Sequence, residues 1–173
     1  MKVQVQSLSS IHNRKNFDCG QAQLNSWLAT MAGQQQEKNI ARTFVAVNPG
    51  DPATILGFYT LTVSDVDGRN CPSHNRLPNR VPVVRLGRFA TSINIQGKGL
   101  GSLLLQNALE RIYEISAHAG VAAVVVDAKD QKAADFYKNR GFLPSPKEAL
   151  NKSTSDQRRA NPPTLIRQRG FGE

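Results

Sequence analysis

Apolar and polar positions alternate along the chain with two different periods, and the order of these segments predicts an α/β fold. Residues 3–8 alternate residue by residue, residues 42–47, 55–63 and 81–91 are strand-like, and residues 121–126 are almost continuously apolar. Alternation predicts a strand with one buried face, whereas a continuous apolar run predicts a strand buried on both faces. We therefore expect five strands in these segments.

Three further segments follow the period of an amphipathic helix. The first follows Asp18, a residue type that caps helices, and its apolar face holds Leu24, Trp27, Leu28 and Met31. The second helix covers residues 103–119, and the third is short, begins at the cap residue Asp130 and ends at Gly141. The order strand, helix, three strands, helix, strand, helix predicts an α/β domain around a mixed sheet.

Two polar segments separate the predicted strands. Residues 48–52 contain Pro, Gly and Asp and predict a turn between two strands. Residues 65–80 are polar and contain Pro72 and Pro78, so we expect a surface loop there.

A glycine-rich run lies between the strand at 81–91 and the long helix. Its seven members are Gln96, Gly97, Lys98, Gly99, Leu100, Gly101 and Ser102. At a helix start, glycines let the backbone approach a ligand closely and point free N–H groups at it. The helix dipole adds positive potential at the same place. The run predicts a phosphate or pyrophosphate site, and the alternative is a flexible glycine-rich turn.

The spacing of the glycines distinguishes between the known phosphate-binding motifs. The chain has no Walker sequence, and its glycines do not have the Gly-x-Gly-x-x-Gly spacing of a dinucleotide site. The pattern that fits is Gln/Arg-x-x-Gly-x-Gly/Ala, with Gln96, Gly99 and Gly101. This pattern resembles the pyrophosphate loop of the GCN5-related N-acetyltransferase (GNAT) family, where it holds acetyl-coenzyme A.

The resemblance extends over residues 8–146. The flanking segments 84–90 and 134–142 resemble the family as a whole. Segments 17–20, 24–28 and 42–44 resemble one branch, the toxins of bacterial type II toxin–antitoxin systems that acetylate aminoacyl-tRNA. The resemblance implies a GNAT acetyltransferase domain over residues 1–146, with a central mixed, mostly antiparallel sheet flanked by helices.

The same resemblance implies a function. We expect an acetyl-CoA-dependent N-acetyltransferase that acetylates the amino group of aminoacyl-tRNA and blocks translation, and that pairs with a ribbon-helix-helix antitoxin and forms a homodimer. Two alternatives stay open. One is an N-acetyltransferase of small amines or protein N-termini, and the other is a catalytically weakened GNAT-fold protein that binds coenzyme A or an antitoxin without turnover.

Site residues follow from matching positions in the family. The backbone of Phe89, Ala90 and Thr91 is expected to bind the pantetheine arm, and the run 96–102 the pyrophosphate. Phe136 is placed among the cofactor-binding residues, with a core position as its alternative. Tyr137 matches the tyrosine that donates a proton to the leaving thiolate. A phenol near pKa 10 and a thiol near 8.5 are close enough for this transfer; the alternative is a core aromatic.

The acceptor side is less defined. Arg42, Arg85 and Arg88 match basic positions of the toxin branch and are candidates for binding tRNA, with structural ion pairing as the alternative. The three histidines, His12, His74 and His118, are each expected at the surface, which leaves no obvious general base. An α-amino group near pKa 7.7 is partly deprotonated at neutral pH, so this pattern favours an α-amine over a lysine amine.

Charge and composition limit the kinds of molecule that the protein is expected to bind. The net charge is +9 and the sequence pI is about 10, which favours polyanions such as RNA. From residue 152 onward five basic and two acidic residues give +3, so the rest of the chain carries +6. No apolar run is long enough for a membrane helix, and the first residues lack the apolar core of a signal peptide, so we do not expect secretion. The two cysteines suggest neither a disulfide framework nor a metal site, so we expect a cytoplasmic protein without a metal.

The C-terminal end departs from the family. The family closes with an apolar strand, whereas residues 147–161 are polar and only residues 164–166 form a late apolar stretch. Either this strand is missing, or a long loop precedes a weak strand, or the basic segment 147–173 is disordered. Because the strand helps to form the acceptor cleft in the family, an altered end would affect activity.

Overall fold

The computed structural model describes residues 2–73, 76–146 and 164–168. It divides into two compact units. Unit 1 comprises Met1–Thr62 and Leu86–Glu114, and unit 2 comprises Val63–Arg85 and Ile115–Glu173. The two long central strands and the longest helix each contribute residues to both units, and the units are described one at a time below.

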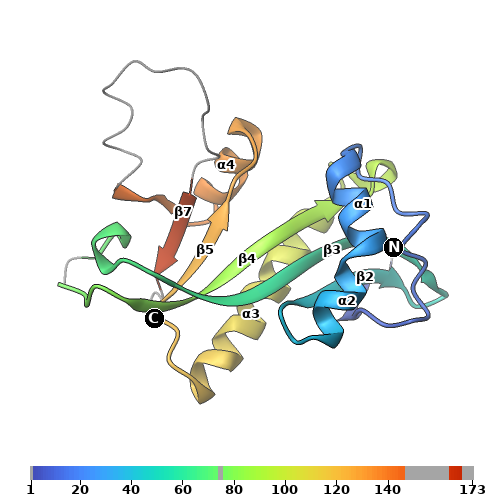
Figure 1. Cartoon of the computed structure of the whole chain (residues 1–173). Coiled ribbons are helices and arrows are strands. Elements are labelled where there is room, and N and C mark those ends of the chain that lie inside the picture. The colour runs from blue at the N-terminus through green and yellow to red at the C-terminus, as the bar shows by residue number, and fades with distance from the viewer. Residues whose placement is uncertain (1, 74–75, 147–163, 169–173) are drawn as a thin grey trace. The chain divides into compact units, whose positions relative to one another are not determined.

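Unit 1 is built on antiparallel strands in the order β1-β2-β3-β4 (Figure 1). Val5 pairs with Ala46 and Val45 pairs with Phe58, which fixes the register of the first three strands. Val81–Thr91 has the bounds that the apolar pattern predicts. The strand bounds are Gln4–Ser7 for β1, Arg42–Asn48 for β2, Asp51–Val66 for β3 and Val81–Thr91 for β4.

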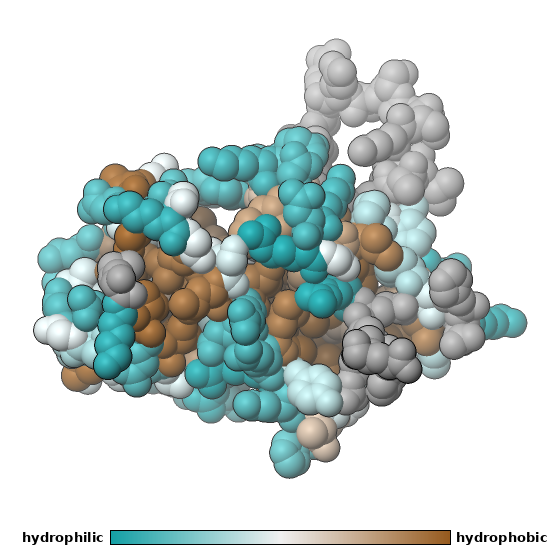
Figure 2. All heavy atoms as spheres, turned by 180° about the vertical axis from the view of Figure 1, so that it is seen from behind, coloured by the Kyte–Doolittle hydropathy of each residue, from teal (hydrophilic) through white to brown (hydrophobic). Residues whose placement is uncertain are grey.

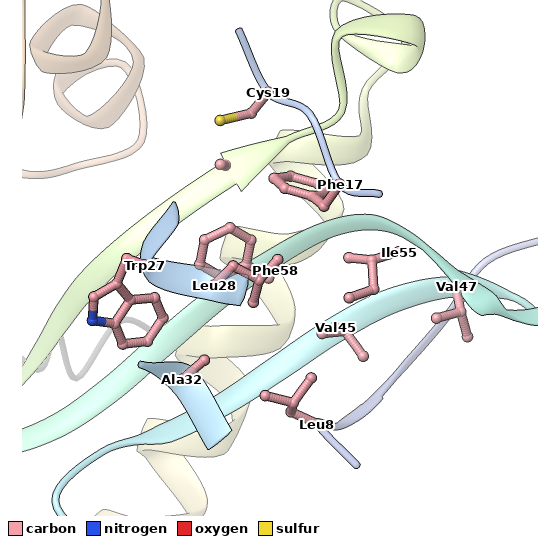
Figure 3. Close-up of a cluster of buried hydrophobic side chains, with 11 residues drawn as sticks. Leu8, Phe17, Cys19, Trp27, Leu28, Ala32, Val45, Val47, Ile55 and Phe58 are labelled. Atoms are coloured by element: carbon pink, nitrogen blue, oxygen red, sulfur yellow. The ribbon is translucent and has the colours of Figure 1, made fainter. Parts of the chain in front are cut away.

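Helices cover both faces of this part of the sheet. On one face, α1 (Ala22–Thr30) and α2 (Ala32–Glu37) pack onto β2 and β3, and α3 (Leu100–His118) lies behind the strands (Figure 1). The core under α1 includes Phe17, Trp27 and Phe58, which are at most 8% exposed (Figure 3). Each large apolar side chain buried in this way contributes about 1.5–3 kcal/mol to folding.

Gly57 allows α3 to approach the opposite face of β3 closely. A Cβ atom at this position would lie 2.8 Å from Cδ1 of Leu104 and 2.9 Å from the carbonyl oxygen of Ala90. The next residue, Phe58, points to the α1 face because side chains alternate along a strand. The absence of a side chain at residue 57 therefore sets how near the helix lies to the strands.

Three local predictions for unit 1 are corrected. Asp18 does not cap α1; its carboxylate accepts hydrogen bonds from the N–H of Gly20 and from Nδ2 of Asn25, both at 2.8 Å. Helix α1 begins at Ala22 instead, after Gln21, which makes no side-chain cap. The turn between β2 and β3 is shorter than predicted, because Asn48 pairs directly with Asp51.

Unit 2 carries the remaining strands in the order β5-β7-β6. Their bounds are Ala123–Asp127 for β5, Leu143–Pro144 for β6 and Thr164–Gln168 for β7. Strand β7 pairs antiparallel with β5 over five residues, with Val125 opposite Ile166. Leu165 and Ile166 are buried. Of the alternatives for the C-terminal end, a weak strand after a long connection is therefore the observed one; residues 147–163 lie outside the described residues.

The segment predicted as a surface loop at 65–80 contains ordered, buried positions. Strand β3 continues to Val66, and a 3₁₀ turn follows at Gly68–Asn70. Cys71 and Gly68 are buried, and a Cβ at residue 68 would lie 2.2 Å from the carbonyl oxygen of Pro78. The loop is therefore packed against itself.

The surface of the described residues mixes hydrophobic and hydrophilic side chains, as the face opposite to that of Figure 1 illustrates (Figure 2). Helix α3 contributes three of the exposed apolar residues, Leu103, Tyr113 and Ile115. Within the part of the chain that the structure describes, no helix has the length and apolar character needed to cross a membrane.

Candidate functional site

The glycine run forms a tight connection between β4 and α3 in unit 1. Helix α3 begins at Leu100, three residues earlier than predicted, so the last residues of the run belong to its first turn. Gly97 and Gly99 have φ angles of +80° and +84°, a region that L-residues with a side chain occupy at a cost of about 1–2 kcal/mol each. A Cβ atom at either glycine would meet nothing within 4 Å. The glycines are thus required by the backbone conformation, and the space beside them is open.

The first turn of α3 has free N–H groups. The first hydrogen bond of the helix runs from the N–H of Leu103 to the carbonyl oxygen of Gly99, at 3.2 Å. The amides of Gly97, Gly99, Leu100 and Gly101 donate to no acceptor among the residues described. These amides and the positive end of the helix dipole together can bind an anion.

Gln96 holds the run in place. Its Nε2 donates to the carbonyl oxygen of Thr91 at 3.1 Å and to that of Cys19 at 3.2 Å. The side chain therefore links the end of β4 and the segment before α1 to the start of the run. Lys98 extends beside it, and its Nζ donates to the carbonyl oxygen of Asn94 at 3.2 Å. The geometry gives a reason for a side chain with N–H donors at residue 96.

The predicted pantetheine residues lie at the end of β4, just before this connection. Ala90 is buried, and Phe89 and Thr91 are half-buried. Thr91 is also the residue whose carbonyl oxygen Gln96 binds. Unit 1 thus brings together the residues at 89–91 and 96–102.

Tyr137 lies in unit 2, on α4 (Gln131–Lys138). Asp130 caps this helix as predicted, because its carboxylate accepts a hydrogen bond from the N–H of Ala133 at 2.7 Å. The Tyr137 ring is 6% exposed and packs edge-on against Phe136 and Phe142. Burial raises the pKa of the Tyr137 phenol above its ordinary value, so the hydroxyl is protonated at neutral pH and is a weaker acid than an exposed phenol.

Phe136 is half-buried rather than a core residue. The guanidinium carbon of Arg140 lies 3.9 Å from the centre of its ring, and Nη1 of Arg140 donates to the Phe136 carbonyl oxygen at 2.8 Å. Part of the ring remains accessible, as a contact with a cofactor requires.

The three candidate arginines have different surroundings. Arg42 is exposed at the start of β2, in unit 1. Arg85 belongs to unit 2 and forms an ion pair with Asp127, so the structural alternative applies to it. Arg88 belongs to unit 1, where its guanidinium carbon lies 4.2 Å from the centre of the Trp27 ring.

One expectation about the histidines is wrong. His12 is 5% exposed, and its Nδ1 accepts a hydrogen bond from the N–H of Ser9 at 2.9 Å. Burial lowers the pKa of His12, which favours the neutral ring that this bond needs. His118 is exposed as expected, and His74 lies outside the described residues.

Comparison with known proteins identifies the family. A model described as the acetyltransferase (GNAT) family matches residues 7–142, well over half of the chain. The chain belongs to the GNAT family. This confirms the predicted family, the α/β GNAT fold and the class of enzyme, an N-acetyltransferase that uses acetyl-CoA.

Relatives of this GNAT enzyme include toxins. A Mycobacterium tuberculosis protein named tRNA-acetylating toxin is 31% identical over 146 residues, which cover 83% of this chain and 86% of the relative. The solved structure of AtaT complexed with acetyl-methionyl-tRNAfMet is 26% identical, with a TM-score of 0.81 and coverage of 96% and 95%. A mutant AtaT toxin bound to the C-terminus of the antitoxin AtaR and acetyl-CoA is also 26% identical, with a TM-score of 0.74 and coverage of 96% and 92%.

The residues of this GNAT enzyme fit acetyl-CoA. The free amides and the open space at Gly97 and Gly99 suit a pyrophosphate, which needs N–H donors and close approach of the backbone. Sequence reasoning missed two contributions to this part of unit 1. One is the Cys19 carbonyl that Gln96 binds, and the other is the stacking of Arg88 on Trp27. The sequence has a single tryptophan, and it lies on the predicted apolar face of a helix, which indicates that its ring packs against other side chains. The sequence does not indicate that Arg88 is one of them.

Proposed function

We propose that this GNAT enzyme is a toxin that acetylates the amino group of aminoacyl-tRNA and thereby blocks translation. The observation that supports this most is the 31% identity to a tRNA-acetylating toxin over 83% of the chain. The net charge of +9 agrees with a polyanionic substrate, since positive surfaces attract nucleic acids.

In this proposal unit 1 holds the acyl donor. The amides of Gly97, Gly99, Leu100 and Gly101 bind the pyrophosphate, and the backbone of Phe89, Ala90 and Thr91 binds the pantetheine arm. Gln96 keeps the run attached to β4, and Lys98 and Ser102 contribute side chains to the cofactor. Phe136, a residue of unit 2, is a further candidate for binding the cofactor. Acetyl-CoA supplies an activated acetyl thioester.

Tyr137 is the proposed general acid. The α-amine of the aminoacyl ester forms a bond to the thioester carbonyl carbon and loses a proton to water, and the C–S bond breaks. Tyr137 then gives its phenolic proton to the leaving sulfur and regains one from water. An α-amine is partly deprotonated at neutral pH, so the reaction requires no strong base.

Further parts of the proposal concern partners and organisation. We infer a ribbon-helix-helix antitoxin, a homodimer and a cytoplasmic location, with the catalytic domain in residues 1–146 and an atypical basic segment in residues 147–173. Arg42 and Arg88 are the better candidates for the tRNA backbone, because Asp127 already binds Arg85.

The activity is tested with labelled acetyl-CoA. Charged tRNA, uncharged tRNA, free amino acids and polyamines are offered separately and as competitors, and the label is followed to the product. We expect label on charged tRNA alone. Label only on free amino acids or polyamines would reject the toxin function and support an acetyltransferase of small amines.

Tyr137 is tested by Tyr137→Phe, which keeps the ring and removes the hydroxyl. We expect turnover to fall at least tenfold while the Kd for acetyl-CoA, measured by calorimetry, changes by less than about twofold, because the proton donor acts on the leaving group. Equal turnover in the two proteins would remove Tyr137 from the mechanism.

A further inference from the structure

Arg88 is a half-buried cation that has no anionic partner among the described residues. Its backbone N–H donates to Oγ1 of the buried Thr60 at 2.8 Å, and its guanidinium lies over the Trp27 ring, 4.2 Å from the centre. Within the described ranges, no side chain or carbonyl accepts a hydrogen bond from this guanidinium. Burial also lowers the pKa of Arg88, which shows that water is partly removed from the charge.

A second stacked arginine in the same unit is different. The guanidinium carbon of Arg111 lies 4.2 Å from the centre of the Phe44 ring, the same distance as in the first pair. Arg111 has an acceptor of its own, because its Nε donates to Oδ1 of Asn107 at 3.2 Å. Stacking on an aromatic ring therefore does not by itself leave a guanidinium without an acceptor.

Trp27 also packs its ring against an aromatic side chain of the core. Its ring is nearly parallel to that of Phe58, with the centres 6.1 Å apart, and Phe17 packs edge-on against Phe58 at 5.4 Å. Figure 3 shows the indole nitrogen on the side of Trp27 that faces away from Leu28 and Phe58. This nitrogen is covered and has no hydrogen-bond acceptor in the described part of the chain. Arg88 and Trp27 thus both carry N–H donors for which no described residue supplies an acceptor.

This arrangement indicates a ligand that brings acceptor oxygens. A partly desolvated charge without a counter-charge is unfavourable unless a ligand supplies one. A guanidinium presents N–H groups in a planar fork that matches two oxygens of a phosphate, and its stacking on an indole leaves the edge of the fork available. The acyl donor's pyrophosphate already has the free amides of the glycine run, so the matching anion is a phosphodiester of the acceptor RNA.

We propose that Trp27 is a positioning residue, whose ring holds the Arg88 guanidinium for a bidentate contact with a backbone phosphate of the RNA. The inference rests on the proposed function for the identity of the anion. Trp27 then has a part in binding the substrate, although it is a core residue. Neither its residue type nor its position on α1 indicates such a part.

The test measures RNA binding by the full-length protein. The probe is a fluorescent, uncharged RNA hairpin with the acceptor stem of a tRNA, and the Kd is measured at several KCl concentrations. Arg88→Gln and Trp27→Leu are each expected to raise the Kd about tenfold and to lower the slope of log K against log salt by about 0.7–0.9, the loss of one phosphate contact. Trp27→Phe keeps an aromatic face and is expected to stay within about threefold of the wild type.

Coupling between the two residues provides a sharper measurement. The double variant Trp27→Leu with Arg88→Gln is expected to bind no more weakly than Arg88→Gln alone, since both changes remove one contact. Arg111→Gln is the matched control: it removes one charge and one stacked guanidinium, and its Kd is expected to stay within about twofold. The Kd for acetyl-CoA is expected to be unchanged in all five variants.

Several results would overturn the inference. These are a Trp27→Leu protein that binds RNA like the wild type, an equal loss in Arg111→Gln, a parallel loss of acetyl-CoA binding, or a wild-type protein that does not bind the hairpin. If Trp27→Leu does not fold, the Kd of Arg88→Lys for the RNA hairpin tests the inference instead. This variant keeps the positive charge and lacks the planar fork of N–H groups. A loss similar to that of Arg88→Gln supports the inference, and wild-type affinity rejects it. Acetylation of charged tRNA by the wild type separates failure of this inference from failure of the proposed function.

Discussion

The two helices that carry the proposed catalytic parts begin in opposite ways. Helix α4, which carries Tyr137, is closed by its own chain: the Asp130 carboxylate accepts the N–H of Ala133 at 2.7 Å. Helix α3 begins with two glycines at positive φ, open space beside them, and amides without acceptors in the described part of the chain. Both helix starts present the positive end of a helix dipole and N–H groups that have no acceptor within the helix itself.

The difference shows how a common element becomes structural or functional. A carboxylate at the cap supplies charge and an acceptor, so α4 needs no ligand for its first turn. In α3 the equivalent position is Gly99, which has no side chain to do this. The chain therefore leaves the positive end of α3 for an anion from outside, and the proposed pyrophosphate is such an anion.

The strongest way to break this comparison is to give α3 the cap of α4. We expect Gly99→Asp to raise the Kd for acetyl-CoA at least a hundredfold, because the new carboxylate occupies the free amides and repels the pyrophosphate. The matched variant is Gly99→Asn, which has nearly the same shape, no charge, and a residue type that tolerates positive φ. Its expected loss is about tenfold. Calorimetry with acetyl-CoA measures both, and equal losses would show that charge at this helix end does not matter.

A smaller loss of acetyl-CoA affinity is expected when the glycine run loses the hydrogen bonds that attach it to its neighbours and the start of α3 is left unchanged. Gln96→Leu removes the two hydrogen bonds to Thr91 and Cys19, each with a net value of about 0.5–1.5 kcal/mol. We expect the Kd for acetyl-CoA to rise about five- to twentyfold. Gln96→Arg retains N–H donors at this position and is the control, with an expected change below threefold. Wild-type affinity in Gln96→Leu would mean that the run holds its conformation without this side chain.

The sequence predicts those features of the two helix starts and their neighbouring strands that depend on local patterns of residues. The bounds of β4 and the cap at Asp130 follow from residue types and spacing, and both are observed. The same reasoning fails at Asp18, because its carboxylate makes a local turn with Gly20 and Asn25 instead of capping α1. Short polar side chains have several backbone partners within reach, and the choice depends on where the chain goes next.

Tertiary contacts explain the other failures. Strand β7 has only two apolar residues at its centre, Leu165 and Ile166, and owes its place to pairing with β5. The ring nitrogens of the buried His12 lie within hydrogen-bond distance of Ser9 and Gln6, three and six residues earlier, and the pattern of apolar and polar residues does not indicate these contacts. The stacking of Arg88 on Trp27 joins residues 61 positions apart in the sequence. Such contacts carry no periodic signal.

The smallest effect on binding is expected when α4 loses its cap. Asp130→Ala should lower the free energy of unfolding by about 1 kcal/mol, the usual value of an N-cap. The Kd for acetyl-CoA should stay within about twofold, because this helix end satisfies itself and takes no ligand. Asp130→Asn keeps an acceptor oxygen and should restore most of the stability. Urea unfolding followed by circular dichroism measures the first quantity and calorimetry the second. A large loss of acetyl-CoA affinity in Asp130→Ala, with little loss of stability, would mean that the start of α4 also contributes to binding acetyl-CoA. The two helix starts would then no longer differ in function.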